Sequence, residues 1–300
     1  MGAMLFALSC LFVSVGNAQT FLTNGLVSFY PFDGNANDKI GSNHATVFGA
    51  ELAENRFGQA AKSYAFSKVG DFIRTDNTAG LPNGTEDFSI SLWMLLSAIP
   101  APADDPHQVL FANGGINQFQ LNLSPFSDSN SQLRFYLGGD AQGDLESPPI
   151  EWSVNRWYSL QLTRTGNTLR IYRDGVLVTE SQTAQGNNSL SQLDFGYRAS
   201  NNNHQFYGRL DDIRIYNRAL SDAEIAKLYA FESTPSLPLE IEVASVRLKW
   251  PSEAGAAYEI LYSTAFQDWT LLKTVAGTGD TLEYVDPTQG ERRFYRLVKK

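Results

Sequence analysis

The sequence is poor in the residues that build disulfides, histidine metal centres and catalytic triads. Its 300 residues include one cysteine, Cys10, and three histidines, His44, His107 and His204, which lie far apart. With a single cysteine no internal disulfide can form, so a hydrophobic core must hold the fold. The sequence also contains no G-x-S-x-G, H-E-x-x-H or glycine-rich phosphate-loop motif. These absences disfavour the common hydrolase, zinc-protease and nucleotide-binding classes.

Positive charge and long apolar runs are scarce as well. The formal net charge is −9, whereas nucleic acids and anionic membrane surfaces select basic partners. The longest N-terminal apolar run, residues 4–15, is too short to cross a bilayer. A hydrophobic fraction of 43% with 18% charged residues is typical of a globular chain. We therefore expect no nucleic-acid partner.

The first 18 residues are expected to form a secretory signal peptide. The apolar run is followed by the small residues Gly16 and Ala18, which suit signal-peptidase cleavage, although Lys and Arg are missing before it. A disordered apolar N-terminus is the alternative. The segment Ala7–Cys10 also loosely resembles a lipoprotein cleavage box. Cleavage after Ala18 or lipidation of Cys10 both stay open, and either would give a secreted or cell-surface protein without membrane insertion after signal removal.

Alternating residues and tight turns predict a mostly antiparallel β-protein. Residues 87–96 alternate between two faces, and Gly166-Asn167 and Asp174-Gly175 are hairpin-turn signals. One helix is expected after residue 220, because Ser221 and Glu224 form a capping box ahead of an apolar helical face. The predicted fold class is all-β: an antiparallel sandwich with one short helix.

Three stretches resemble one family of jelly-roll domains. They are GLVSFYPFDGNANDKIGSNH from residue 25, WYSLQLTRTGNTLRIYRDGVLV from residue 157 and GRLDDIRIYNRALSDAEIAKLY from residue 208. Together they resemble the laminin-G-like domains of the concanavalin A-like lectin/glucanase superfamily over residues 21–232. The resemblance implies a jelly-roll sandwich that ends in a single helix.

The remaining C-terminal residues predict a second, smaller domain. Residues 233–239 contain two prolines and no regular pattern, so we predict that they form a linker. Short strands then recur over residues 240–300, and the run YEILYS…DWTLL…YVDP…RFYRL is similar to fibronectin type III-like modules of bacterial exported proteins. The resemblance implies a small β-sandwich.

A cluster of oxygen-bearing side chains follows the first predicted strand. Asp33, Asn35 and Asp38 are hard ligands of the kind that calcium prefers. The resemblance implies a structural calcium ion held by these residues together with Asp211 or Asp212 of the last strand. The alternative is an Asn/Asp turn held by its own side-chain hydrogen bonds.

Ligand-binding residues are expected at the rim of the sandwich and on aromatic platforms. The candidates are Asp104, Asp105, His107, Asn202, Asn203 and His204 in loops, with Tyr136 and Trp152 as platforms. For each loop residue the alternative, an ordinary solvated side chain, is the more frequent case.

Three functions fit this sequence. The first is a non-catalytic binding module for a glycan or another extracellular polymer, and the second is a cell-surface adhesion protein that binds other proteins. A glycoside hydrolase is the third, but retaining enzymes of this fold need carboxylates at alternating strand positions. The nearest candidates, Asp211/Asp212 and Asp144/Glu146, do not supply three of them. We therefore expect no enzyme activity.

Overall fold

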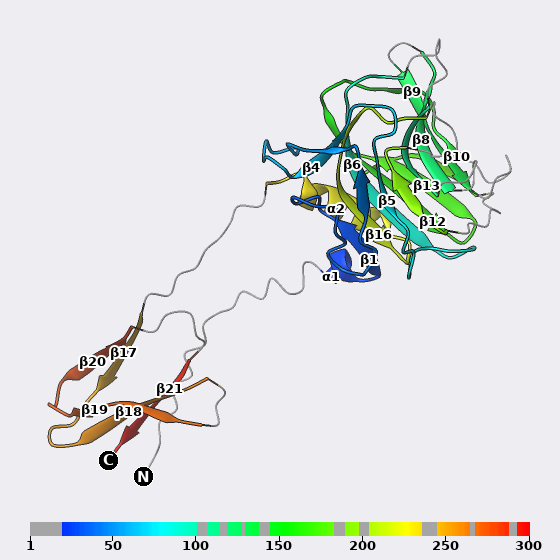
Figure 1. Ribbon diagram of the computed structural model, residues 1–300. Coiled ribbons are helices and arrows are strands. Elements are labelled where there is room, and N and C mark those ends of the chain that lie inside the picture. The colour runs from blue at the N-terminus through cyan, green and yellow to red at the C-terminus, as the bar shows by residue number, and fades with distance from the viewer. Residues whose placement is uncertain are drawn as a thin grey trace. The chain divides into compact units, whose positions relative to one another are not determined.

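The computed structural model describes two compact units of the chain. It covers residues 20–100, 107–113, 119–127, 130–137, 145–182, 190–197, 204–235, 245–264, 268–287 and 293–300. The larger unit ends at Pro235, and the C-terminal residues from Ser236 belong to the smaller unit (Figure 1). The predicted signal peptide lies outside the described residues.

Two eight-stranded sheets face each other in the larger unit, and every strand pair within them is antiparallel. Sheet A has the order β14-β13-β12-β6-β16-β4-β3, with β1 pairing with β16. Its strands are β1 (Leu26–Tyr30), β3 (Glu51–Ala53), β4 (Ser63–Phe66), β6 (Phe88–Leu96), β12 (Trp157–Thr165), β13 (Thr168–Arg173), β14 (Val176–Ser181) and β16 (Gly208–Tyr216).

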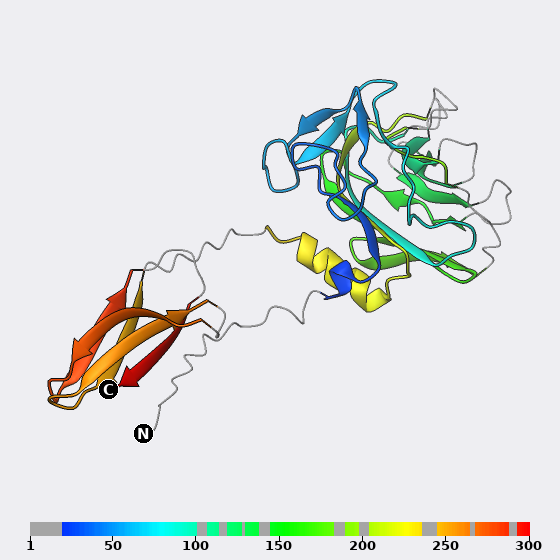
Figure 2. The same ribbon diagram turned by 60° about the horizontal axis from the view of Figure 1, so that its bottom comes forward.

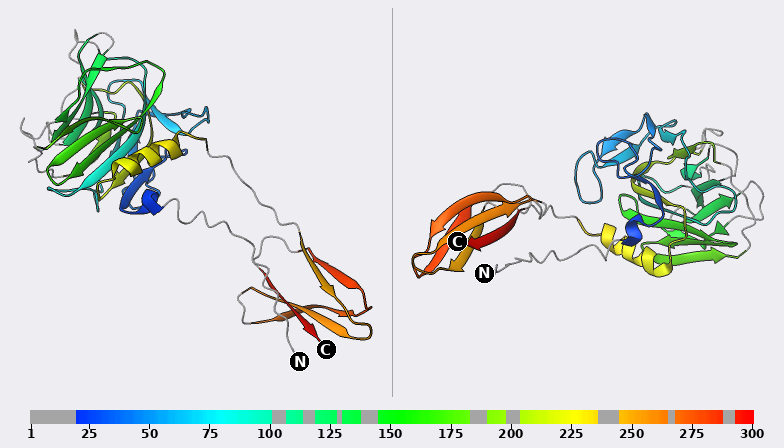
Figure 3. Two further views of the ribbon diagram at one scale, coloured as in Figure 1. Left: turned by 180° about the vertical axis from the view of Figure 1, so that it is seen from behind. Right: turned by 90° about the horizontal axis from the view of Figure 1, so that it is seen from below.

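Sheet B has the order β10-β9-β8-β7-β15-β5-β2, with β11 pairing with β9. Its strands are β2 (Thr46–Phe48), β5 (Phe72–Thr75), β7 (Gln108–Ala112), β8 (Phe119–Pro125), β9 (Asn130–Leu137), β10 (Leu145–Glu146), β11 (Ile150–Glu151) and β15 (Leu193–Phe195). Figure 3 shows the two layers from behind and from below.

The core lies between the sheets, where alternate side chains of each strand meet. Phe88, Ile90, Leu92 and Met94 of β6 belong to it, whereas Trp93 points to the outer face of sheet A. This is the alternation that the sequence predicts for residues 87–96. The all-β fold class is confirmed. Among the described residues α2 (Asp222–Glu232) is the one substantial helix, and α1 (Thr20–Thr23) is a single turn.

Helix α2 lies on the outer face of sheet A. The capping box predicted at Ser221 and Glu224 is present, and it starts the helix at Asp222. Ile225 and Leu228 then pack with Tyr172 and Tyr216, which project outward from sheet A, and the cluster also includes residues of α1 and its neighbourhood. Figure 2 shows α2 beside α1 in this region. The outer face of sheet A is therefore covered by α2 around Tyr172 and Tyr216, whereas the edge strand β14 stays exposed.

The smaller unit is built from five described strands in two sheets. One sheet pairs β17 (Val246–Pro251) with β20 (Thr281–Asp286), and the other has the order β19-β18-β21, formed by β19 (Thr270–Ala276), β18 (Ala257–Ser263) and β21 (Phe294–Lys299). Trp250, Tyr258 and Ile260 form its buried core. Among the described residues of both units, no helix is long and apolar enough to cross a membrane.

Candidate functional site

The outer face of sheet B carries a row of mainly polar residues. Strand register places Thr46, Arg74, Asp194, Ala112, Gln120 and Tyr136 opposite one another, from β2 across to β9. None of these residues belongs to the core between the sheets. A parallel row runs from Asn122 through Arg134 to Glu146. Helix α2 packs on sheet A, not on sheet B. Most side chains of the sheet B row are nevertheless buried, including Asp194, Ala112 and Gln120, so the exposed groups of this face lie at its β2–β5 end, where Phe48 is exposed and Arg74 is partly exposed.

An aromatic stack lies at the β2–β5 end of this face. The rings of Phe48 and Phe72 are stacked with centroids 4.4 Å apart and an interplanar angle of 16°. Tyr197 continues the stack at 5.9 Å from Phe72, and the Arg74 guanidinium lies 4.9 Å from the Phe72 ring centre. Phe48 is 41% exposed, which is unusual for a phenylalanine in a strand. Tyr197 is 6% exposed, so the accessible ring surface is that of Phe48, with Phe72 partly exposed beside it.

Charged groups beside the stack are held in fixed positions. Arg74 donates two hydrogen bonds to Asp194, from Nε to Oδ1 at 2.6 Å and from Nη2 to Oδ2 at 2.9 Å. Gln192 donates a third to Asp194 Oδ2 at 3.1 Å. The hydrogen bond that Arg74 donates to Asp194 raises the pKa of Arg74, against the effect of burial. This bidentate pair fixes a cation and its donors on the outer face.

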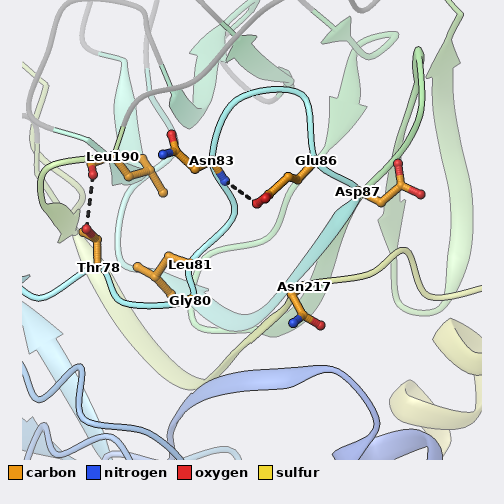
Figure 4. A pocket seen from close by; sticks show the side chains of 8 residues that line it. All are labelled: Thr78, Gly80, Leu81, Asn83, Glu86, Asp87, Leu190 and Asn217. Atoms are coloured by element: carbon orange, nitrogen blue, oxygen red, sulfur yellow. Dashed lines mark hydrogen bonds between the residues drawn. The ribbon is translucent and has the colours of Figure 1, made fainter.

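A second candidate region is a hollow at one end of the sandwich. Its volume is about 610 Å³, within the range of small-ligand sites. It is lined by Thr78, Gly80, Leu81, Asn83, Glu86, Asp87, Leu190 and Asn217 (Figure 4). Two hydrogen bonds shape it: Thr78 donates to the Leu190 carbonyl at 3.2 Å, and the Asn83 N–H donates to Glu86 at 3.0 Å. The lining carries amides and carboxylates but no aromatic ring.

Both predicted platform residues are more buried than a ring that stacks on a sugar needs to be. Trp152 is 4% exposed, packs edge-on to Tyr158 at 4.9 Å and donates from Nε1 to the Ser131 carbonyl at 3.1 Å, so it is a core residue. Tyr136 does lie on the outer face of sheet B, but it is 9% exposed with the Arg134 guanidinium 4.6 Å from its ring centre. Phe48 of β2 is an exposed ring beside the Arg74–Asp194 pair that sequence reasoning missed.

Two of the predicted rim residues meet in space. His107 and His204 come from distant segments, and their ring centroids are 5.0 Å apart in an edge-on arrangement. The other four rim candidates, Asp104, Asp105, Asn202 and Asn203, lie outside the described residues. A ligand role for this rim stays a prediction.

The predicted calcium ligands of the first loop already have protein partners. Asp38 is 5% exposed and accepts backbone N–H bonds from Phe29, Ile40 and Asn43 at 3.0–3.3 Å. Although burial raises its pKa, backbone hydrogen bonds outweigh that effect and hold the pKa of Asp38 below its usual value. Asp33 pairs with Lys62 at 3.0 Å, and Asn35 accepts from the Asn37 N–H at 2.9 Å. These contacts match the alternative of a turn stabilised by its own hydrogen bonds.

The other predicted ligands, Asp211 and Asp212, are paired with Arg56. The guanidinium donates from Nη1 to Asp211 Oδ2 at 2.9 Å and lies with Nη2 2.8 Å from Asp212 Oδ2. Burial, reinforced by the charge of Asp212, raises the pKa of Asp211 to about 9 even though Arg56 lowers it. In the part of the chain that the structure describes, no three acidic, histidine or cysteine residues gather to hold a metal ion. The described residues therefore do not fit the expected calcium site, and calcium binding itself stays an untested prediction.

Comparisons with known proteins place the fold in a family. The model of the concanavalin A-like lectin/glucanases superfamily, of the laminin-G type, matches residues 67–226, more than half of the chain. The protein therefore belongs to this superfamily. No curated protein sequence matches it.

Several solved structures share the fold at low sequence identity. Domain 4 of an extracellular GH43 arabinanase from Geobacillus stearothermophilus, solved with arabinotriose, is 18% identical with a TM-score of 0.53, covering 68% of this chain and 98% of that domain. The binding domain of paraclostridial mosquitocidal protein 1 is 19% identical with a TM-score of 0.54, covering 80% of this chain and 58% of its own. A Trypanosoma rangeli sialidase solved with sialic acid is 19% identical with a TM-score of 0.53, covering 70% of this chain but 33% of the sialidase. At these identities the likeness is one of fold alone.

Proposed function

We propose that the protein is a non-catalytic, exported glycan-binding module whose larger unit binds sugars on the outer face of sheet B. The observation that carries the proposal is the aromatic stack of Phe48, Phe72 and Tyr197 beside the Arg74–Asp194 pair. Sugar rings have apolar C–H faces that pack on aromatic rings and hydroxyl edges that need fixed hydrogen-bond partners. In this proposal the exposed Phe48 ring supplies the apolar contact and the partly exposed Arg74 guanidinium, held in place by the buried Asp194, supplies the polar one.

The similar folds support the same reading. The arabinanase domain was solved with arabinotriose and the sialidase with sialic acid, so two of the similar structures contain a sugar. Those ligands belong to those proteins; here they suggest a glycan as the ligand class. We propose that the smaller unit, with its two small sheets, is a fibronectin type III-like module and that residues 1–18 direct export to the cell surface or medium.

The proposal is tested by measuring binding of the full chain to an immobilised glycan array, followed by calorimetry on the best soluble oligosaccharide. Phe48→Ala should weaken that affinity about 3- to 10-fold, because it removes one stacking contact. Phe48→Trp should retain or strengthen binding, since it keeps an aromatic surface in the same place.

Phe231→Ala is the matched control, because Phe231 is 43% exposed, as Phe48 is 41% exposed, but lies on helix α2 over sheet A. It should bind as the wild type does. Equal losses of affinity in Phe48→Ala and Phe231→Ala, or an affinity that Phe48→Ala leaves unchanged, would contradict the proposed site. Release of reducing sugars by the wild type from any array polysaccharide would contradict the non-catalytic role.

A further inference from the structure

The loop after β3 contributes a buried cation to the outer side of sheet A. The Arg56 side chain is 8% exposed, and its guanidinium lies 4.5 Å from the Trp93 ring centre and 4.6 Å from that of Phe57. All three of its nitrogens face oxygen atoms. Nη1 and Nη2 contact the carboxylates of Asp211 and Asp212. Nε donates a hydrogen bond to the backbone carbonyl of Glu232 at 2.8 Å. Arg56 thus holds together β16 and the last residue of α2.

The two carboxylates reach Arg56 because β16 has a local irregularity in its backbone. Asp211 and Asp212 are adjacent, so in a regular strand their side chains would point to opposite faces. Asp212 instead has a left-handed backbone with φ of 45°, at the register shift between β16 and β6. Both carboxylates can therefore reach the same guanidinium. A left-handed non-glycine residue is costly, so it persists only where surrounding contacts hold it.

We infer that Arg56 is a built-in cation that occupies a three-oxygen site of the kind that a divalent ion would otherwise fill, so that this domain ties its last strand to α2 without a metal. Three observations carry this. Two carboxylates and a carbonyl are calcium-type ligands, all three lie within 2.9 Å of guanidinium nitrogens, and Asp38 is committed to backbone amides. The inference is independent of the proposed glycan site.

The test compares thermal unfolding of the full-length wild type, Arg56→Met and Arg56→Lys, each in EDTA and in millimolar calcium. The wild type should show the same Tm in both solutions. Arg56→Met removes the cation that contacts the buried Asp211 and the partly buried Asp212, so its Tm in EDTA should fall by about 10 °C, and calcium should recover part of the loss by binding the folded form. Arg56→Lys keeps a cation and should not respond to calcium.

A second readout detects the ion directly. Terbium stands in for calcium, and an indole close to it sensitises its luminescence; Trp93 is the ring beside Arg56. Saturable sensitised emission is expected from Arg56→Met and not from the wild type or from Arg56→Met combined with Asp212→Asn.

Two outcomes would overturn the inference. One is a wild-type Tm that rises with calcium and loses that rise in Asp212→Asn, because the native site would then take a metal. The other is an Arg56→Met protein as stable as the wild type in EDTA. Should Arg56→Met fail to fold, two measurements keep the inference testable. One is the wild-type calcium titration. The other is the double variant Arg56→Met/Asp211→Asn, which replaces the more buried carboxyl group and should fold better.

Discussion

Individual aromatic residues in this domain separate into those that build the core and those that face outward. Trp152 and Phe48 show the difference, because one is 4% and the other 41% exposed. Sequence alone could not sort them: both are aromatic residues in or next to short strands, and Trp152 was the expected platform. What decides is the layer into which each side chain points, and this follows from register across the whole sheet.

We predict that Trp152→Ala acts on folding. It removes a buried indole that packs on Tyr158 and donates to the Ser131 carbonyl, so the free energy of unfolding should fall by about 3–5 kcal/mol. Urea unfolding followed by circular dichroism measures this. Phe126→Ala, at a ring that is 55% exposed, is the control and should change stability by less than about 0.5 kcal/mol. If Trp152→Ala kept wild-type stability but lost glycan binding, Trp152 would be a sugar-stacking residue and not a core residue.

At the scale of elements, the segment best predicted from sequence is the closing strand and helix. The capping box at Ser221 and Glu224 and the hairpin turn at Asp174 need only neighbouring residues, so local patterns are enough to find them. The Arg56 contacts were missed for the opposite reason. Arg56 lies in a loop without a motif, and its partners Asp211 and Glu232 come from the far end of the unit.

Helix α2 gives a prediction with a defined pH dependence. Hydrogen bonds from Arg218, helped by Ser221, lower the pKa of Glu224 to about 2 from its ordinary value near 4.5. Because the folded-state pKa is depressed, the stabilisation is fully present above the ordinary pKa and is lost as the pH falls from about 4.5 toward 2.

Glu224→Gln keeps the capping geometry but loses the ion pair with Arg218, which is 2.8 Å long and partly exposed. At pH 7 the variant should be less stable than the wild type by about 1 kcal/mol. Urea unfolding at several pH values should show the two proteins converging near pH 2. Glu51→Gln, an exposed residue of β3, is the control and should show no such trend. Equal stability of the two proteins at pH 7 would mean that Glu224 acts through capping alone, and a loss that stays constant down to pH 2 would contradict the pH-dependent role of the ion pair.

At the scale of the whole molecule, the fold follows from the sequence more directly than the site does. Repeated strand patterns, hairpin turns and one capped helix are local signals, and they indicate the superfamily to which residues 67–226 belong. The proposed site is assembled by sheet register from Phe48, Phe72 and Tyr197, which lie on three separate segments. No spacing in the sequence brings these rings together, so the stack emerges only from the folded sheet.

The measurement that tests the central claim most directly is nuclear magnetic resonance mapping of a bound oligosaccharide on the full chain. The glycan-binding account predicts that ligand-induced amide shifts gather on β2, β5 and the segment after β15, around Phe48, Phe72 and Tyr197, and extend toward Arg74. Shifts confined to the end hollow around Asn83 and Asn217, or to the smaller unit, would contradict it.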